Sequence, residues 1–169
     1  MAEASGCSGP TLYLIERGGP GRLATMAAPR GGDDLAAELA ALREAGVDTL
    51  VSLLGRLDEH LLRLRHERAE ASRAGLRFRR LPTGDFGTPD TDTALGVARE
   101  LRADLLAGRT VAIHCRAGIG RSSVLAATVL RLEGVRPDEA WALIGRARGV
   151  RVPETRAQRD FVDGLDSAL

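Results

Sequence analysis

The chain has 169 residues, of which 44% are hydrophobic and 28% charged, and its formal net charge is +1. This length and composition predict one soluble globular domain, residues 11–169, after a short N-terminal tail, residues 1–10. The near-neutral charge provides no general attraction to nucleic acid or to a membrane surface, and no apolar stretch is long enough for a transmembrane helix.

The chain contains two cysteines, Cys7 and Cys115. Two are too few for a disulfide framework and favour a reducing compartment, so we expect a cytoplasmic protein. The first ten residues also lack the basic start and apolar segment of a secretory signal. Cys7 lies in this small, polar tail and is expected to be a bystander.

Apolar runs separated by turn residues predict four strands in the first half of the chain, at residues 11–15, 22–27, 49–54 and 76–81. The first two flank a glycine-rich turn and are expected to pair as a hairpin at one edge of a sheet. After them, Asp33 or Asp34 can cap a helix that ends at Gly46. Residues 57–74 are expected to be helical, with the polar second half, residues 66–73, facing solvent.

Residues 81–90, LPTGDFGTPD, contain two prolines and two glycines and are predicted to form a loop. This loop carries Asp85, which is followed by Phe86. Helical spacing predicts three further helices: one capped by Thr91 or Asp92, one that begins at Pro137 and one that begins near Glu154. Strands that alternate with helices predict an α/β fold with a mainly parallel central sheet flanked by helices.

Residues 114–123, HCRAGIGRSS, lie between a β-branched apolar run, residues 110–113, and an apolar run with helical spacing from Val124 onwards. They predict a buried strand, a tight loop and a helix N-terminus. The first amides of a helix have no partners within it, and Gly118 and Gly120 can give the loop positive φ angles that turn more amides inward. The loop therefore predicts an anion site at the carboxyl end of a strand.

Three side chains of this stretch indicate which reaction takes place at the predicted anion site. Cys115 ends the strand, where a helix N-terminus and a neighbouring cation favour the thiolate. Arg121 begins the helix and can hold two phosphate oxygens in a fork, while Ser122 can donate a hydrogen bond to the sulfur. The pattern indicates a cysteine nucleophile that attacks a bound phosphate.

These residues resemble the signature of the cysteine-dependent protein tyrosine phosphatase superfamily, His-Cys-x-x-Gly-x-x-Arg-Ser/Thr. The matching positions are Cys115, Gly118, Arg121 and Ser122. The stretch GDFGTPD, followed by a helix, a strand and the signature, is most similar to dual-specificity-type members such as the kinase-associated phosphatase and its bacterial relatives. The resemblance covers about residues 11–165.

The resemblance implies a phosphatase without a metal or organic cofactor, which works in two steps. Cys115 would attack phosphorus, and Asp85 would protonate the leaving oxygen and then activate the water that hydrolyses the cysteinyl-phosphate. His114 would tune the thiolate. The phosphate would be held by the side chain of Arg121 and by the amides of Arg116, Ala117, Gly118, Ile119, Gly120 and Arg121.

The sequence identifies the general acid and the residue that orients the hydrolytic water less clearly than it identifies the nucleophile. Asp85 fits a Pro-x-x-Asp loop with a later proline, as in the smaller members of the superfamily, whereas Asp90 and Asp92 are rivals that fit helix caps better. Some members orient the hydrolytic water with a glutamine in a C-terminal loop. Gln158 is the candidate here, and an exposed helical glutamine is the alternative.

The substrate is expected to be a phosphorylated protein or peptide, without nucleic acid and without membrane insertion. The single tyrosine, Tyr13, is not part of a pocket-walling motif, so a shallow pocket for phosphotyrosine, phosphoserine and phosphothreonine is predicted. Arginines at positions 77, 79, 80, 116, 146, 148 and 151 could make the rim basic, and solvated surface charges are the alternative for each of them. A phosphoinositide phosphatase is an alternative, although Ile119 replaces the second lysine of that group's signature, and a phosphate-binding pseudophosphatase adaptor is another.

Overall fold

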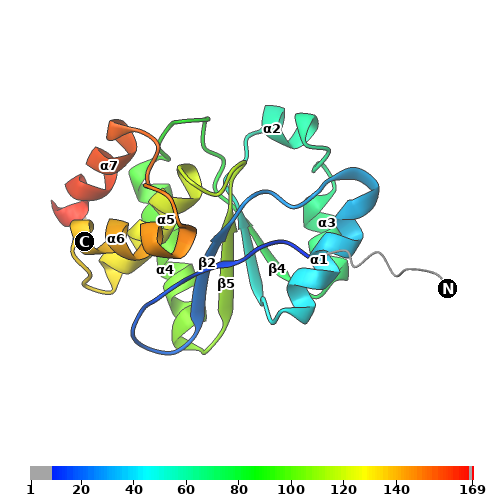
Figure 1. Cartoon of the computed structure of the whole chain (residues 1–169), viewed down its shortest axis with the longest axis horizontal. Coiled ribbons are helices and arrows are strands. Elements are labelled where there is room, and N and C mark those ends of the chain that lie inside the picture. The colour runs from blue at the N-terminus through cyan, green and yellow to red at the C-terminus, as the bar shows by residue number, and fades with distance from the viewer. Residues whose placement is uncertain (1–8, 168) are drawn as a thin grey trace.

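The computed structural model describes residues 9–167 and 169, and it shows a five-stranded sheet between two layers of helices (Figure 1). The strands are β1 (Tyr13–Ile15), β2 (Arg22–Met26), β3 (Thr49–Ser52), β4 (Arg77–Arg80) and β5 (Thr110–His114). They lie in the order β1-β2-β5-β3-β4; β1 is antiparallel to β2, and every other pair is parallel. The predicted mainly parallel sheet with a hairpin at its edge is confirmed.

The helices divide between the two faces of this sheet (Figure 1). One face is covered by α1 (Leu35–Glu44) and α3 (Glu67–Arg73). The other is covered by α4 (Thr91–Leu106), α5 (Arg121–Leu132), α6 (Pro137–Arg148) and α7 (Arg156–Asp163). The short helix α2 (Arg56–Leu61) follows β3 at the carboxyl end of the sheet, and two 3-10 turns, η1 (Gly32–Asp34) and η2 (Gly164–Ser167), complete the fold. Among the described residues, no helix is both long and apolar enough to cross a bilayer.

Each face of the sheet has its own hydrophobic core. Successive side chains of a strand point to opposite faces, so Leu50 and Ala112 pack under α1 and α3 while Val51 and Val111 pack under α4 and α5. All five residues of β5 are buried, because this strand lies at the centre of the sheet and is covered on both sides. The core thus fixes the position of β5, which leads into the loop between β5 and α5, residues 115–120, called the signature loop below.

Two helix starts differ from the sequence prediction. Neither Asp33 nor Asp34 makes a side-chain capping bond, because the turn η1 precedes α1 and changes the approach to the helix. The cap of α4 is Asp90, whose carboxylate accepts from the backbone nitrogen of Thr93 at 3.0 Å. Hydrogen bonds from Thr93 hold the pKa of Asp90 below its ordinary value. This confirms the capping alternative for Asp90, whereas Asp92 lies in the first turn of the helix.

The single helix predicted over residues 57–74 is wrong. The chain breaks between α2 and α3, where Arg63 has a φ of 57°. The carbonyl of Arg63 accepts from the backbone nitrogen of Gly32 at 3.0 Å, and a Cβ on Gly31 would lie 2.0 Å from the carbonyl oxygen of Leu62. The segment after β2 therefore packs directly against the break, and this long-range contact overrides the local helical pattern.

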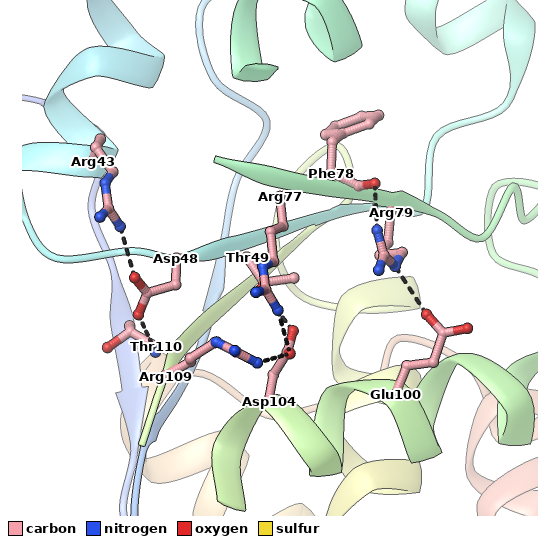
Figure 2. Close-up of polar contacts among 10 residues, drawn as sticks. All are labelled: Arg43, Asp48, Thr49, Arg77, Phe78, Arg79, Glu100, Asp104, Arg109 and Thr110. Atoms are coloured by element: carbon pink, nitrogen blue, oxygen red, sulfur yellow. Dashed lines mark hydrogen bonds and ion pairs between the residues drawn. The ribbon is translucent and has the colours of Figure 1, made fainter. Parts of the chain in front are cut away.

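Polar contacts tie the amino ends of the strands to α4, at the end of the sheet opposite the signature loop (Figure 2). Asp104 of α4 accepts from Thr49 Oγ1 at 2.7 Å, from Arg77 at 3.1 Å and from Arg109 at 2.7 Å. Nearby, Asp48 accepts from the backbone nitrogen of Thr110 at 2.9 Å. These carboxylates hold the starts of β3, β4 and β5 in register.

Replacing Asp48 by asparagine should lower the free energy of unfolding by about 1 kcal/mol at neutral pH, because Arg43 loses a charged partner. The Thr110 amide, followed by Arg43, holds the pKa of Asp48 below its ordinary value of 3.8. A depressed pKa stabilises the fold above the unfolded-state value, and this contribution is lost as the pH falls through the folded-state value. Denaturant unfolding from pH 7 to pH 2 should therefore show the difference between wild type and Asp48→Asn narrowing below pH 3.8.

A suitable control is Asp163→Asn, since the Asp163 carboxylate has no hydrogen bond or ion pair among residues 9–167. It should leave both the stability at neutral pH and its acid dependence close to those of the wild type. A difference for Asp48→Asn that stayed constant down to pH 2 would contradict the assigned role.

Candidate active site

The loop between β5 and α5 turns its carbonyl groups away from the site. The carbonyl of Arg116 accepts from the backbone nitrogen of Ala28 at 3.1 Å. Those of Ala117 and Gly118 each accept from the guanidinium of Arg148 at 3.2 Å. Ala28 and Arg148 thus hold three consecutive carbonyls on the outside of the loop. The amides between these carbonyls therefore point to the inside of the loop.

The amides of this loop have no protein partner. Within the part of the chain that the structure describes, none of the six backbone amides of residues 116–121 donates a hydrogen bond to a protein atom. Gly120 occupies the N-cap position of α5 without a side-chain cap. Amides without partners at a helix start attract negative charge, and the anion site stays a prediction.

The two glycines of the loop have different physical roles. Gly118 has a φ of 72°, as predicted, and a Cβ there would lie 2.6 Å from the carbonyl of Met26. Gly120 has a φ of −92°, so the positive φ expected for it is wrong. A Cβ there would lie 2.3 Å from the carboxylate of Glu154, so a larger residue would require that flexible side chain to move.

Cys115 is 3% exposed and lines a cavity of about 250 Å³. The remaining lining residues are Asp85, Phe86, Arg116, Ala117, Arg121 and Glu154. The hydroxyl of Ser122 lies 3.4 Å from the sulfur, within hydrogen-bonding distance. Two larger hollows of about 770 Å³ each lack a cysteine, so chemistry rather than volume identifies the site. Cys7 lies outside the described residues.

Arg121 is held in place by three acceptors from two segments, α2 and the loop between β4 and α4. Its Nη1 donates to Asp58 of α2 at 2.7 Å and to the carbonyl of Thr83 at 3.0 Å, while its Nη2 lies 3.3 Å from Asp85. The side chain is 2% exposed, so the guanidinium is fixed before any ligand arrives. The sequence did not identify Asp58, because it lies among charged residues with no motif and reaches Arg121 only through the fold.

Asp85 lies at the cavity in a loop that is anchored to α7. One of its carboxylate oxygens accepts from the amide of Phe86 at 3.1 Å, and its side chain is 46% exposed. Phe86 has a φ of 58°, an unfavourable angle for a residue with a side chain. The carbonyls of Phe86 and Gly87 accept from Thr155 at 3.4 Å and from Gln158 at 3.2 Å. These contacts position the candidate acid beside Arg121.

Gln158 is completely buried, so the expectation of an exposed helical glutamine is wrong. Its Oε1 accepts from the amides of Glu154 and Thr155, and with Thr155 it forms a reciprocal cap at the start of α7. Its Nε2 donates to Gly87 and would lie 3.0 Å from a Cβ on Gly120. Gln158 therefore connects three segments: the loop of residues 81–90 that carries Asp85, called the acid loop below, α7 and the signature loop. Its role in orienting water stays a prediction.

His114 lies beneath the nucleophile and pairs with a buried carboxylate. Its Nε2 is 2.6 Å from Glu67 of α3, and its Nδ1 is 3.2 Å from the carbonyl of Cys115. His114 and Glu67 are fully or almost fully buried. The expectation that residues 66–73 simply face solvent is therefore wrong at Glu67, which the polar local sequence concealed.

The basic rim predicted from seven arginines is largely wrong. Arg77, Arg79 and Arg80 form ion pairs with Asp104, Glu100 and Glu59, and Figure 2 shows the first two aimed at α4. Arg148 contacts the signature loop and stacks on Tyr13, with the guanidinium carbon 4.2 Å from the ring centre. Arg146 and Arg151 line the two larger hollows. Of the seven arginines, Arg116 alone lines the cavity with Cys115.

This fold, with a cysteine after its central strand and an arginine at the start of the next helix, defines a cysteine-dependent phosphatase of the protein tyrosine phosphatase class. The family model described as "Polymorphic toxin system, DSP-PTPase phosphatase" matches residues 24–134, and the chain belongs to this family.

Individual relatives agree with this assignment. The chain is 32% identical over 82 residues to the Cyclin-dependent kinase inhibitor 3 of Mus musculus; the match covers 48% of this chain and 39% of the mouse protein. A structure of the kinase associated phosphatase (KAP) with its catalytic-site cysteine changed to serine has a TM-score of 0.85 and 19% identity, over 96% of this chain and 97% of that one. The active form of Tk-PTP has a TM-score of 0.78 and 25% identity, over 95% and 99% of the two chains.

Proposed function

We propose that this protein hydrolyses phosphotyrosine in proteins, and also phosphoserine and phosphothreonine, through a cysteinyl-phosphate intermediate. One observation carries the proposal: Cys115 and Arg121 line a cavity next to six amides without protein partners. A phosphate bound there would be surrounded by N–H donors on one side and a thiol nucleophile on the other. The catalytic domain would comprise residues 11–169.

In the first step, the sulfur of Cys115 attacks phosphorus while the bond to the leaving oxygen breaks. Asp85 gives its proton to that oxygen, because its carboxyl lies at the cavity within 3.3 Å of Arg121. The loop amides and Arg121 stabilise the three remaining phosphate oxygens as charge builds up in the transition state. The product of this step is a cysteinyl-phosphate and a free alcohol or phenol.

In the second step, Asp85 takes a proton from water, which attacks the cysteinyl-phosphate and releases inorganic phosphate. Ser122, 3.4 Å from the sulfur, can donate a hydrogen bond to the departing thiolate. Gln158 would help to orient the water, since its amide lies against the signature loop. His114 would act from beneath through the carbonyl of Cys115.

The substrate range follows from the shape of the site. The single tyrosine, Tyr13, stacks under Arg148 and is absent from the residues that line the cavity. The cavity is small, about 250 Å³, with Phe86 as its aromatic wall. A phenyl phosphate can contact Phe86, and without a deep wall the shorter phosphoserine and phosphothreonine can also reach Cys115.

Activity on matched substrates tests this proposal. We expect a phosphotyrosine peptide to have the highest kcat/KM, phosphothreonine and phosphoserine versions of the same peptide to be turned over more slowly, and a short-chain phosphoinositide to be the poorest. The Glu154 carboxylate lines the cavity and would repel the additional phosphates of an inositol lipid. A preference for the lipid over every peptide would favour the phosphoinositide alternative, and tight phosphopeptide binding without turnover would favour the adaptor.

A reducing compartment, and therefore the cytoplasm, remains our proposed location. The reaction requires a free thiol at Cys115, which the structure shows without a disulfide. An oxidising compartment would convert such a thiol to inactive forms.

A further inference from the structure

The short helix α2 turns its acidic side chains towards the protein and its leucines towards solvent. Asp58 pairs with Arg121 at 2.7 Å, and Glu59 pairs with Arg80 at 2.6 Å. Leu57 and Leu61, one helical turn apart, are 70% and 58% exposed. Surface helices usually bury an apolar stripe and expose their charges, so α2 has the reverse arrangement.

Phe86 provides a third exposed apolar side chain, in the loop that carries Asp85. It is 58% exposed and lines the catalytic cavity. Asp58 of α2 and Asp85 contact one guanidinium, so α2 and the loop of Phe86 both lie next to Arg121. Among the large apolar side chains of the part of the chain that the structure describes, Phe86 and the two leucines of α2 are the most exposed.

We propose that Leu57, Leu61 and Phe86 recognise apolar side chains that flank the phosphorylated residue of a polypeptide substrate. This inference rests on the proposed protein phosphatase activity and specifies its substrates further. A chain bound at the cavity can place its phosphate on the signature loop while its neighbouring residues contact Phe86 at the cavity and the leucines of α2, the helix whose Asp58 holds Arg121. Exposed apolar side chains that gather near one site mark interaction surfaces.

The charges around the cavity favour a polypeptide over a membrane. Surfaces that bind anionic lipids gather lysine and arginine around their apolar side chains. Here the two carboxylates that line the cavity, Asp85 and Glu154, balance its two guanidiniums, Arg116 and Arg121, so the lining has no excess of positive charge. The Glu154 carboxylate has no ion pair or hydrogen bond among residues 9–167. An apolar segment with a single phosphate fits such a surface better than a sheet of anionic head groups.

The test compares two phosphotyrosine peptides that differ only in having leucine or serine on both sides of the phosphotyrosine. The wild type should prefer the leucine peptide by about tenfold in kcat/KM, the selectivity of one apolar contact. The double variant Leu57→Gln/Leu61→Gln should lose this preference through KM. It should keep kcat/KM for p-nitrophenyl phosphate, which has no flanking groups, within about twofold.

Leu106→Gln is the matched control, because Leu106 is 54% exposed at the end of α4 and does not line the catalytic cavity. It should retain the full preference. Equal use of the two peptides by the wild type, or a preference that survives in the double variant, would overturn the inference. So would a parallel loss on p-nitrophenyl phosphate, which would show that the leucines only hold Asp58 in place.

Two further results separate this inference from its rivals. If the double variant lost turnover of a phosphoinositide in anionic vesicles but not of either peptide, the surface would be a membrane contact and the inference would be wrong. If the wild type turned over neither the peptides nor p-nitrophenyl phosphate, the proposed function itself would fail. Turnover of both peptides without discrimination would leave the proposed function intact and refute only the inference.

Discussion

Cys115→Ser should abolish phosphatase activity, with a fall in kcat of at least about 10⁴-fold, as for the loss of other covalent nucleophiles. A serine hydroxyl is a far weaker nucleophile than a thiolate, and the residues that line the cavity include no imidazole to activate it. Turnover of p-nitrophenyl phosphate and of a phosphotyrosine peptide measures the loss.

The same variant should still bind tungstate with an affinity close to that of the wild type. Anion binding depends on the amides of residues 116–121 and on Arg121, and serine leaves these groups unchanged. Isothermal titration of both proteins with tungstate makes the comparison. Retention of substantial turnover by the serine variant would rule out the cysteinyl-phosphate route.

Arg121→Lys is the complementary control, since it keeps the positive charge but loses the two-pronged fork. A lysine cannot reach Asp58, Thr83 and the phosphate together in the geometry that the guanidinium has. It should weaken tungstate binding and lower turnover together, whereas Cys115→Ser lowers turnover alone. This contrast separates attack from binding.

The sequence predicted the strand, turn and helix around Cys115 well because the constraint there is local. The apolar run of β5, the glycine at 118 and the helical spacing of α5 lie within about twenty consecutive residues, so strand, turn and helix could be read together. Gly118 illustrates the point, since its positive φ is a property of the backbone at one position.

The sequence predictions that the structure contradicts concern contacts between distant segments of the chain. Arg77, Arg79 and Arg80 were expected at the rim, but their partners lie on α4 and α2, which no local pattern reveals. Glu67 was expected to face solvent, yet it pairs with His114, 47 residues away. Both errors have one physical cause: a charged side chain lies wherever the fold places an opposite charge or a hydrogen-bond partner.

Asp58 and Glu154 show the same limit at the active site itself. Asp58 fixes Arg121 from α2, and Glu154 lines the cavity from the segment before α7. Neither belongs to the signature or to the acid loop, and each reaches the site from a different part of the chain. The structure therefore adds Glu154 as a rival to Asp85 for the role of general acid, and the two can be separated by experiment.

Asp85→Asn should lower turnover by about 10²–10⁴-fold on substrates with a poor leaving group, the usual contribution of a positioned general acid. The loss should shrink for aryl phosphates with more acidic phenols, because such leaving groups need less help from a proton. The variant should also lose the alkaline fall of the pH–rate profile, since asparagine has no proton to release. Turnover of two aryl phosphates of different acidity, measured across pH, checks both effects.

Three matched variants make the assignment of Asp85 specific. Asp92→Asn should change neither the leaving-group dependence nor the pH profile, because Asp92 lies in the first turn of α4. Asp90→Asn should also leave the leaving-group dependence and the pH profile unchanged, with little effect on stability, since asparagine caps helices nearly as well as aspartate. Glu154→Gln tests the carboxylate that shares the cavity. If Glu154→Gln or Asp92→Asn showed the leaving-group dependence and Asp85→Asn did not, the general acid would be misassigned. The proposed attack by Cys115 would still stand, because the nucleophile depends on a different set of contacts.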